Sequence, residues 1–172
     1  MASKAAETAD FIKTVRLFRE FNEPELLALT GRLRERRLRR GQVLFREGDE
    51  GEEMFLVRDG SILVSKAVKG NVEQILARFG PGDFFGEMSL FDRAPRSATI
   101  QAETETELLA LDRDNLNGLI QVNPRAAAAF FHGLVQVFIE RLRTSGELVA
   151  EITRWGLEAT GLDVERPASG GH

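Results

Sequence analysis

The sequence predicts an α+β, mainly β fold: an antiparallel β-roll or jelly-roll barrel, flanked by N-terminal helices and a long C-terminal helix. Between residues 33 and 112, glycines recur at intervals of 10 to 12 residues, each beside another turn-forming residue. Before and after that stretch, apolar residues recur at steps of three or four, as they do in amphipathic helices. Evenly spaced short strands joined by such turns are typical of antiparallel rolls and barrels.

Residues 1–32 are expected to form the N-terminal helical segment. Asn22 is followed by Pro24 and Glu25, which together predict the start of a helix. The Asn22 side chain can accept hydrogen bonds from the first amides, proline is tolerated in the first turn, and Glu25 suits the positive end of the helix dipole.

Residues 33–112 are expected to form the roll. The pair Asp59-Gly60 separates two apolar runs and predicts a β-hairpin. The pair Gly70-Asn71 marks the next turn. Glycine supplies the positive φ that such turns require without a steric penalty.

Residues 113–160 are expected to form a hinge and a long helix that begins at Pro124. An apolar stripe from Leu134 to Trp155 runs about 22 residues, longer than one face of a small roll needs. A partner helix from a second copy would bury the remainder, so the sequence predicts a homodimer through this helix. Gly146 interrupts the stripe and is a candidate kink or hinge. Residues 161–172 are expected to form a disordered tail.

The composition excludes several classes of function. The 172 residues include no cysteine and two histidines, one of them at the C-terminus, and the formal net charge is −4. Disulfides, thiolate zinc sites and cysteine nucleophiles are therefore excluded, and a metal site is not expected. The charge balance argues against a protein that binds nucleic acid over its whole surface. The polar N-terminus resembles no secretory signal, and the longest mostly apolar run is too short to span a bilayer, so we expect a cytoplasmic protein.

A basic cluster lies at the start of the first expected strand. We interpret it as a solvated strand edge, where charge discourages aggregation. Contact with an acidic partner, a lipid or nucleic acid is the alternative interpretation. The cluster consists of Arg32, Arg34, Arg36, Arg37, Arg39 and Arg40.

The segment that carries the chemistry is GPGDFFGEMSLFDRAPRSATI, residues 80–100. It predicts a turn, a short helical segment opened by Gly86, and a strand that begins at Arg96. A glycine at such a start lets backbone amides approach an anion, and the planar arginine fork matches the oxygens of a phosphate. Glu87 would then accept hydrogen bonds from sugar hydroxyls. The alternative is a surface pair of Arg96 and Glu87 that stabilises a loop.

The letters FGE, L and PRSAT of this segment resemble the phosphate-binding cassette of cyclic nucleotide-binding domains, the family of the catabolite activator protein and of the regulatory subunits of cyclic-AMP-dependent kinase. The segments RRGQVLFREGDEGEEMFLVRDGSILV, LIQVNP and ERLRTS also resemble this family, over roughly residues 11 to 150. The resemblance implies that Glu87 accepts the ribose 2′-hydroxyl and that Arg96 pairs with the cyclic phosphate. It further implies ligand-binding roles for Gly86, Met88, Ser89, Ser97 and Ala98.

In the activator branch of the family, adjacent hydroxyl residues on the long helix reach the adenine base. Thr144 and Ser145 resemble that pair, although the alignment needs about one extra helical turn after Pro124. Trp155 is the alternative contact to the base by stacking, and a place in a dimer core is the simpler interpretation of this residue.

The resemblance implies a stand-alone cyclic nucleotide receptor. We favour cAMP over cGMP as the ligand. Binding would shift the C-terminal helix and so regulate an unidentified partner protein. The main alternative is the ligand-binding part, or a relative, of a catabolite-activator-type transcriptional regulator, although only 17 residues follow Trp155, too few for a helix-turn-helix domain. A cupin-like, metal-dependent enzyme is the third interpretation; it is disfavoured because such a site gathers several histidines.

Overall fold

The computed structural model describes residues 3–68 and 72–159, except the side chains of 148, 151, 152 and 154–159. The expected turn at Gly70, the side chain of Trp155 and the expected tail lie outside what is described. The chain divides into two compact units, Met1–Gly133 and Leu134–His172, which are described separately below.

The roll of the first unit consists of two four-stranded antiparallel sheets. The first sheet has the order β1 (Arg34–Leu38), β8 (Thr106–Asp112), β3 (Glu53–Asp59) and β6 (Phe84–Phe85). The second has the order β2 (Val43–Phe45), β7 (Thr99–Ala102), β4 (Ile62–Val68) and β5 (Val72–Phe79). The predicted fold class is confirmed, but within the described strands the two sheets are not joined by pairing into a closed barrel.

The hairpin predicted at Asp59-Gly60 is wrong, because β3 and β4 belong to different sheets. Gly60 has a φ of +86°, and a Cβ at this position would lie 2.3 Å from the carbonyl oxygen of Glu105. The glycine is needed where the chain crosses closely over the connection between β7 and β8. The acidic run Asp49, Glu50, Glu52 and Glu53 has the composition of a hairpin tip, but it lies between β2 and β3, which also belong to different sheets, so a hairpin tip is the wrong interpretation of this run.

The space between the sheets is filled by an apolar core in which phenylalanine rings contact one another. The rings of Phe55 and Phe85 stack with centroids 5.4 Å apart, and Phe79 stacks on Phe85 at 5.9 Å. The buried members of this core are Leu38, Phe55, Val57, Ile62, Phe85, Ile100, Ala102, Leu108 and Ala110.

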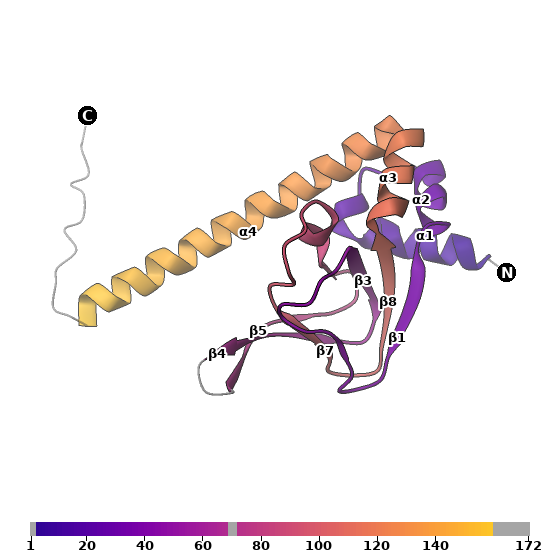
Figure 1. Ribbon diagram of the computed structural model, residues 1–172. Helices are drawn as coiled ribbons and strands as arrows, with labels where there is room; N and C mark the ends of the chain where they lie inside the picture. Colours follow the sequence, from indigo (N-terminus) through magenta and orange to yellow (C-terminus); the bar gives the residue numbers. More distant parts are fainter. Residues whose placement is uncertain (1–2, 69–71, 160–172) are drawn as a thin grey trace, which may run out of the picture. The chain divides into compact units, whose positions relative to one another are not determined.

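Helices gather at one end of the roll, as Figure 1 shows for α1 (Lys4–Thr14), α2 (Glu23–Thr30) and α3 (Arg113–Val122). A 3-10 helix, η1 (Arg16–Phe18), joins α1 to the segment before α2. The predicted start of α2 is confirmed: the Glu25 amide donates to Asn22 Oδ1 at 3.0 Å, and the Asn22 amide donates to Glu25 Oε2 at 2.8 Å.

Helix α4 (Pro124–Ala159) begins in the first unit and packs its first turns against the N-terminal segment. The rings of Phe130 and Phe18 lie 6.0 Å apart between centroids. Gly133 approaches the backbone so closely that a Cβ there would lie 2.5 Å from the Leu17 carbonyl oxygen. The N-terminal segment and the beginning of α4 therefore form one packed junction.

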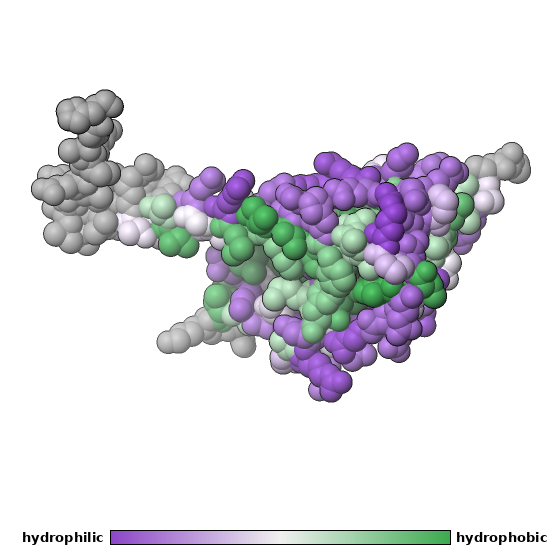
Figure 2. Space-filling model, turned by 90° about the horizontal axis from the view of Figure 1, so that it is seen from above, coloured by the Kyte–Doolittle hydropathy of each residue, from purple (hydrophilic) through white to green (hydrophobic). Residues whose placement is uncertain are grey.

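In the second unit α4 continues as uninterrupted helix through Gly146, so the kink considered there does not break the helix. Leu142 and Val149 on this part of α4 are exposed. Figure 2 shows apolar side chains lying among polar ones on the face that it presents. Among the described residues, no helix combines the length and the apolar character needed to cross a bilayer.

Candidate functional site

The cassette begins where the short strand β6 ends at Phe85. Gly86 follows with a left-handed backbone, φ +78°, and caps the 3-10 helix η2 (Glu87–Leu90). A Cβ at Gly86 would lie 2.8 Å from Arg96 Nη1 and 2.9 Å from the Glu53 carbonyl oxygen. Glycine is therefore required twice over, by its backbone conformation and by the close approach of an arginine. The predicted short helix opened by Gly86 is confirmed.

Arg96 lies in the loop before β7, because that strand begins at Thr99. The expectation that a strand begins at Arg96 is therefore wrong. Two backbone hydrogen bonds fix the residue instead: its amide donates to the Asp49 carbonyl at 2.8 Å, and its carbonyl accepts from the Gly48 amide at 2.8 Å. These bonds hold Arg96 against the loop that connects the two sheets.

The Arg96 side chain is 6% exposed. Its Nη1 donates to Ser89 Oγ at 3.0 Å, and its guanidinium carbon lies 4.1 Å from the centroid of the Phe45 ring. A Cβ on Gly51 would overlap the guanidinium, at 2.3 Å from Nε. Its Nε is buried and has no hydrogen-bond partner within the described part of the chain. A buried donor of this kind is costly unless something satisfies it.

Burial lowers the pKa of the Arg96 guanidinium, while the charges of Glu53 and Asp49 act to raise it. The ordinary pKa of arginine is so high that the group remains a cation. Glu87 is 3% exposed and therefore also buried. The interpretation of Arg96 and Glu87 as a surface pair is wrong, because neither side chain is at the surface.

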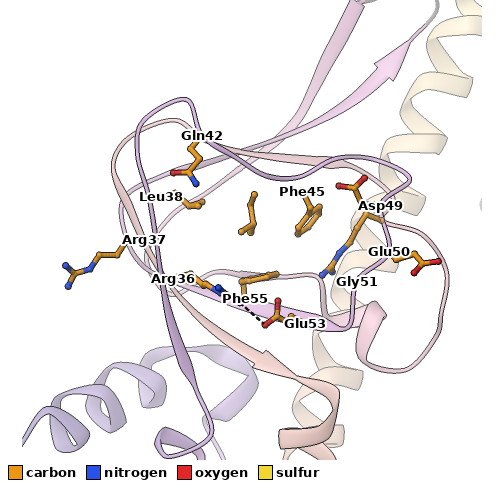
Figure 3. Close-up of a pocket in the computed structure, with 12 residues that line it drawn as sticks. Arg36, Arg37, Leu38, Gln42, Phe45, Asp49, Glu50, Gly51, Glu53 and Phe55 are labelled. Carbon is orange, nitrogen blue, oxygen red and sulfur yellow. Dashed lines mark ion pairs between the residues drawn. The ribbon is translucent and has the colours of Figure 1, made fainter.

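A cavity of about 460 Å³ reaches Arg96 from the side of β1, β2 and β3. Figure 3 shows the rings of Phe45 and Phe55 facing this hollow, whereas Arg37 is directed away from it. A dashed line in the same view marks the ion pair of Arg36 with Glu53, 3.7 Å between Nη2 and Oε1. The cavity thus combines an apolar floor with charged groups at its rim.

The structure brings Gly86, Ser89 and Arg96 into direct proximity, as the sequence predicted. Ser89 is buried, Met88 is 58% exposed, Ser97 is exposed, and Ala98 is half-buried. Thr144 and Ser145 are exposed on α4 in the second unit, where Ser145 Oγ donates to the Arg141 carbonyl at 2.9 Å.

Sequence reasoning missed Gly51 and Phe45, which enclose the guanidinium of Arg96. Nothing in the sequence around Gly51 indicates this contact, because glycine is common in loops for reasons of backbone conformation alone. Three members of the basic cluster, Arg34, Arg36 and Arg37, lie exposed on β1, an edge strand that pairs with β8 alone, as the interpretation of a solvated strand edge requires. In the described portion of the chain, no group of three or more histidine, aspartate or glutamate residues is arranged to hold a metal ion.

Comparison with known proteins identifies the fold and the family. The family model described as "Cyclic nucleotide-binding domain" matches residues 35–123, just over half of the chain. The chain is 41% identical over 103 residues to the Cyclic AMP receptor protein of Thermus thermophilus, a match that covers 60% of this chain and 46% of that protein.

Two solved structures extend the comparison. A cyclic nucleotide-binding domain from Methylobacillus flagellatus superimposes with a TM-score of 0.74 at 28% identity, covering 86% of this chain and 83% of that chain. The regulatory domain of Toxoplasma gondii PKA, solved with cAMP, gives a TM-score of 0.62 at 30% identity and covers 69% of this chain and 46% of that chain. With the cassette geometry described above, these matches show that the chain belongs to the cyclic nucleotide-binding domain family.

Proposed function

We propose that this chain is a receptor for a cyclic mononucleotide, with cAMP preferred over cGMP. The observation that carries the proposal is the buried guanidinium of Arg96, whose Nε lacks a hydrogen-bond partner in the described chain. A cation buried to this degree is stabilised by an anion that reaches it. A cyclic phosphate supplies one negative charge and acceptor oxygens for the planar arginine fork.

The residues around Arg96 suit a phosphate attached to a sugar. Gly86 lets the Arg96 guanidinium lie directly against the start of η2, and Ser89 holds the guanidinium through its hydroxyl. We assign the cyclic phosphate to Arg96, with support from Ser97 and from the backbone near Ser89. Ala98 would line the cassette where a larger side chain would crowd the ligand.

We assign the ribose to Glu87, whose carboxylate would accept a hydrogen bond from the 2′-hydroxyl. Glu87 is buried within the same 3-10 helix that Gly86 opens, so its carboxylate belongs to the cassette and not to the solvated surface. Met88 is the exposed member of that helix and would contact the ligand from its open side. A deoxyribose analogue should therefore bind more weakly than the ribonucleotide.

The preference for cAMP draws support from two relatives. The Thermus thermophilus protein is named for cyclic AMP, and the Toxoplasma gondii regulatory domain was solved with cAMP. We propose that Thr144 and Ser145 on α4 reach the base, and that this contact favours one arrangement of the helix. The shift is limited to the difference in ligand affinity between the two arrangements.

We further propose that a second copy of the chain covers α4 between Leu134 and Trp155, giving a homodimer. Leu142 is 72% exposed and Val149 is 62% exposed, and a facing helix would bury both. Sedimentation at increasing concentration tests the dimer. A chain that stays monomeric, with and without cyclic nucleotide, contradicts it.

Calorimetric titration with cAMP and with cGMP tests the central proposal. We expect one nucleotide per chain and tighter binding of cAMP. A competition titration of the two nucleotides in one cell fixes the preference. No heat with either nucleotide at concentrations up to tens of micromolar would overturn the proposed function.

A second candidate function is the ligand-binding part of a regulator of transcription. It is favoured by the curated relatives, of whose length the chain spans about half, 46% and 59% in the Thermus thermophilus and Mycobacterium tuberculosis proteins. The second of these is a CRP-like cAMP-activated global transcriptional regulator. The complete reading frame that encodes the chain distinguishes the two candidates, because such a regulator needs an element that reads DNA.

A further inference from the structure

Arg113 makes an unusual set of hydrogen bonds around the C-terminal end of η2. Its Nε donates to the Leu90 carbonyl at 3.0 Å, and its Nη2 donates to the carbonyls of Ser89 at 2.7 Å and Asp92 at 3.0 Å. Its Nη1 donates to Glu52 Oε1 at 2.8 Å. One guanidinium thus satisfies three backbone carbonyls that the end of a short helix leaves without intrahelical partners.

The position of Arg113 in its own helix contradicts the usual preference. It is the first residue of α3, and a cation at the N-terminal end opposes the helix dipole. The same cation at the C-terminal end of η2 is favourable. The local penalty in α3 is therefore explained by what the side chain does for the cassette.

Arg113 and Arg96 are connected through the same residues. Ser89 accepts from Arg96 with its side-chain hydroxyl and from Arg113 with its carbonyl. On the other side, the Arg113 amide donates to the Glu52 carbonyl at 3.0 Å, and the neighbouring Gly51 is the residue against which the Arg96 guanidinium packs. The two arginines, η2 and the loop before β3 therefore form a closed ring of contacts.

We infer that Arg113 is a positioning residue for the nucleotide site. It holds η2 in the geometry that accepts ligand, and it connects the cassette to the first turn of α3. The inference rests on the proposed function for the identity of the ligand, but the restraint on η2 exists with or without nucleotide. Occupancy of the cassette then reaches α3 directly, through the guanidinium that both share.

The first test measures the ligand-free protein. The Phe91 and Asp92 amides donate to the Met88 carbonyl, at 3.0 and 3.1 Å, and report on the integrity of η2 by hydrogen exchange. In Arg113→Gln these amides should exchange about tenfold faster, because the carbonyls at the end of η2 lose their donors. Arg113→Lys keeps the charge with fewer aligned donors, so its exchange rates should lie between those of the wild type and of Arg113→Gln.

Glu52→Gln is the matched control. It removes the carboxylate at the exposed end of the contact, since Glu52 is 65% exposed, and leaves the three carbonyl bonds in place. A second control, Arg78→Gln, removes an arginine whose side chain is 60% exposed, against 19% for Arg113. Both controls should keep the exchange rates of the wild-type cassette.

The second test adds cAMP. Arg113→Gln should weaken binding about tenfold, as expected for the loss of well-aligned hydrogen bonds that position the site. In the wild type, nucleotide should slow exchange in η2 and in the first turns of α3. In Arg113→Gln the protection of α3 should be lost even at saturating nucleotide, which a role confined to stability would not produce.

The outcomes separate this inference from the proposed function. If the wild type binds neither cAMP nor cGMP, the proposed function fails, and the exchange rates of the ligand-free variants still decide whether Arg113 restrains η2. If Arg113→Gln retains wild-type exchange in η2, the inference is wrong, whatever the nucleotide does. If exchange rises but binding and the protection of α3 are unchanged, the link from Arg113 to the ligand is wrong.

Discussion

Two buried charged side chains lie in different regions of the first unit, and they differ in how completely their polar atoms are hydrogen-bonded. Glu25, at the helical junction, is 2% exposed, and both of its oxygens accept from Arg125 Nη1 at 2.6 Å, while Oε2 also accepts from the Asn22 amide. Arg96, in the cassette, is 6% exposed, and its Nε has no partner in the described residues.

We interpret this difference as that between a structural charge and the ligand-binding charge of the proposed function. Taking a charge out of water costs several kcal/mol, and interactions with hydrogen-bonded partners must offset that cost. At Glu25 the compensation comes from Arg125 and the Asn22 amide, both within the chain, so the carboxylate stabilises the junction. At Arg96 the compensation is incomplete within the described residues, and the proposed cyclic phosphate would complete it.

Substitution of Arg96 should have the largest effect, and it tests whether this buried charge binds the ligand. In Arg96→Ala the dissociation constant for cAMP should rise about ten- to a hundredfold, because a charged hydrogen bond contributes about 1.5–3 kcal/mol. The thermal midpoint of the ligand-free protein should change little, because the loss of packing on Phe45 and of the hydrogen bond to Ser89 opposes the removal of an incompletely paired buried cation. Calorimetry and thermal unfolding measure the two effects.

Arg37→Ala is the control for that substitution, because Arg37 lines the same cavity but is directed away from it (Figure 3). Its affinity for cAMP should equal that of the wild type. Unchanged binding in Arg96→Ala would show that the phosphate is held elsewhere.

Gly133 tests the packing of the helical junction. In Gly133→Ala the new Cβ would lie 2.5 Å from the Leu17 carbonyl oxygen, so helix α4 or the N-terminal segment must shift. We expect the free energy of unfolding to fall by about 1–3 kcal/mol, as for other overpacked sites. Urea denaturation measures the change. Gly146→Ala, where nothing lies within 4 Å of the added Cβ, should not destabilise the protein.

Glu25 provides the counterpart to Arg96. Glu25→Gln should lower the free energy of unfolding by about 1–2 kcal/mol, because it weakens charged hydrogen bonds at a buried site. The affinity for cAMP should not change. Glu20→Gln is the control, since Glu20 is 56% exposed and its contact with His132 lies at the surface. A large loss of affinity in Glu25→Gln would mean that the junction takes part in binding.

Much of the architecture could be predicted from local signals. The helix start at Asn22, the helix start at Pro124 and the short helix opened by Gly86 each follow from the backbone preferences of a few neighbouring residues. The pairing of strands could not be predicted in this way. A turn at Gly60 is equally compatible with a hairpin and with a crossing between sheets. The pairing partners of β3 and β4 distinguish the two, and those partners come from distant parts of the sequence.

The same limit applies to the site. Gly86, Ser89 and Arg96 were predicted because they lie within one short segment that carries the cassette pattern. Gly51 and Arg113 come from outside that segment, and they reach the site through packing between sheets and helices. Nothing in their immediate sequence indicates such a contact, apart from the unfavourable position of an arginine at the start of α3.

The smallest expected effect is the pH dependence of the contribution from Glu25. Burial alone would raise the pKa of this carboxyl, but the hydrogen bonds from Arg125 and from the Asn22 amide lower it below its ordinary value of 4.5. The folded state therefore binds this proton less readily than the unfolded state does. The stabilisation is complete above the ordinary pKa and is lost as the pH falls through the lower, folded-state value.

The measurement is the difference in unfolding free energy between the wild type and Glu25→Gln, taken by urea denaturation across a range of pH. This difference should be constant from about pH 6 to about pH 7.5 and should shrink as the pH falls below the ordinary glutamate value. The pKa of Glu35 and that of Glu103 are also lowered, but both groups are present in the two proteins, so their effects cancel. A difference that grows toward acid pH would mean that the buried carboxyl is protonated in the folded state. Glu25 would then not be a paired, charged side chain, and its contrast with Arg96 would be wrong.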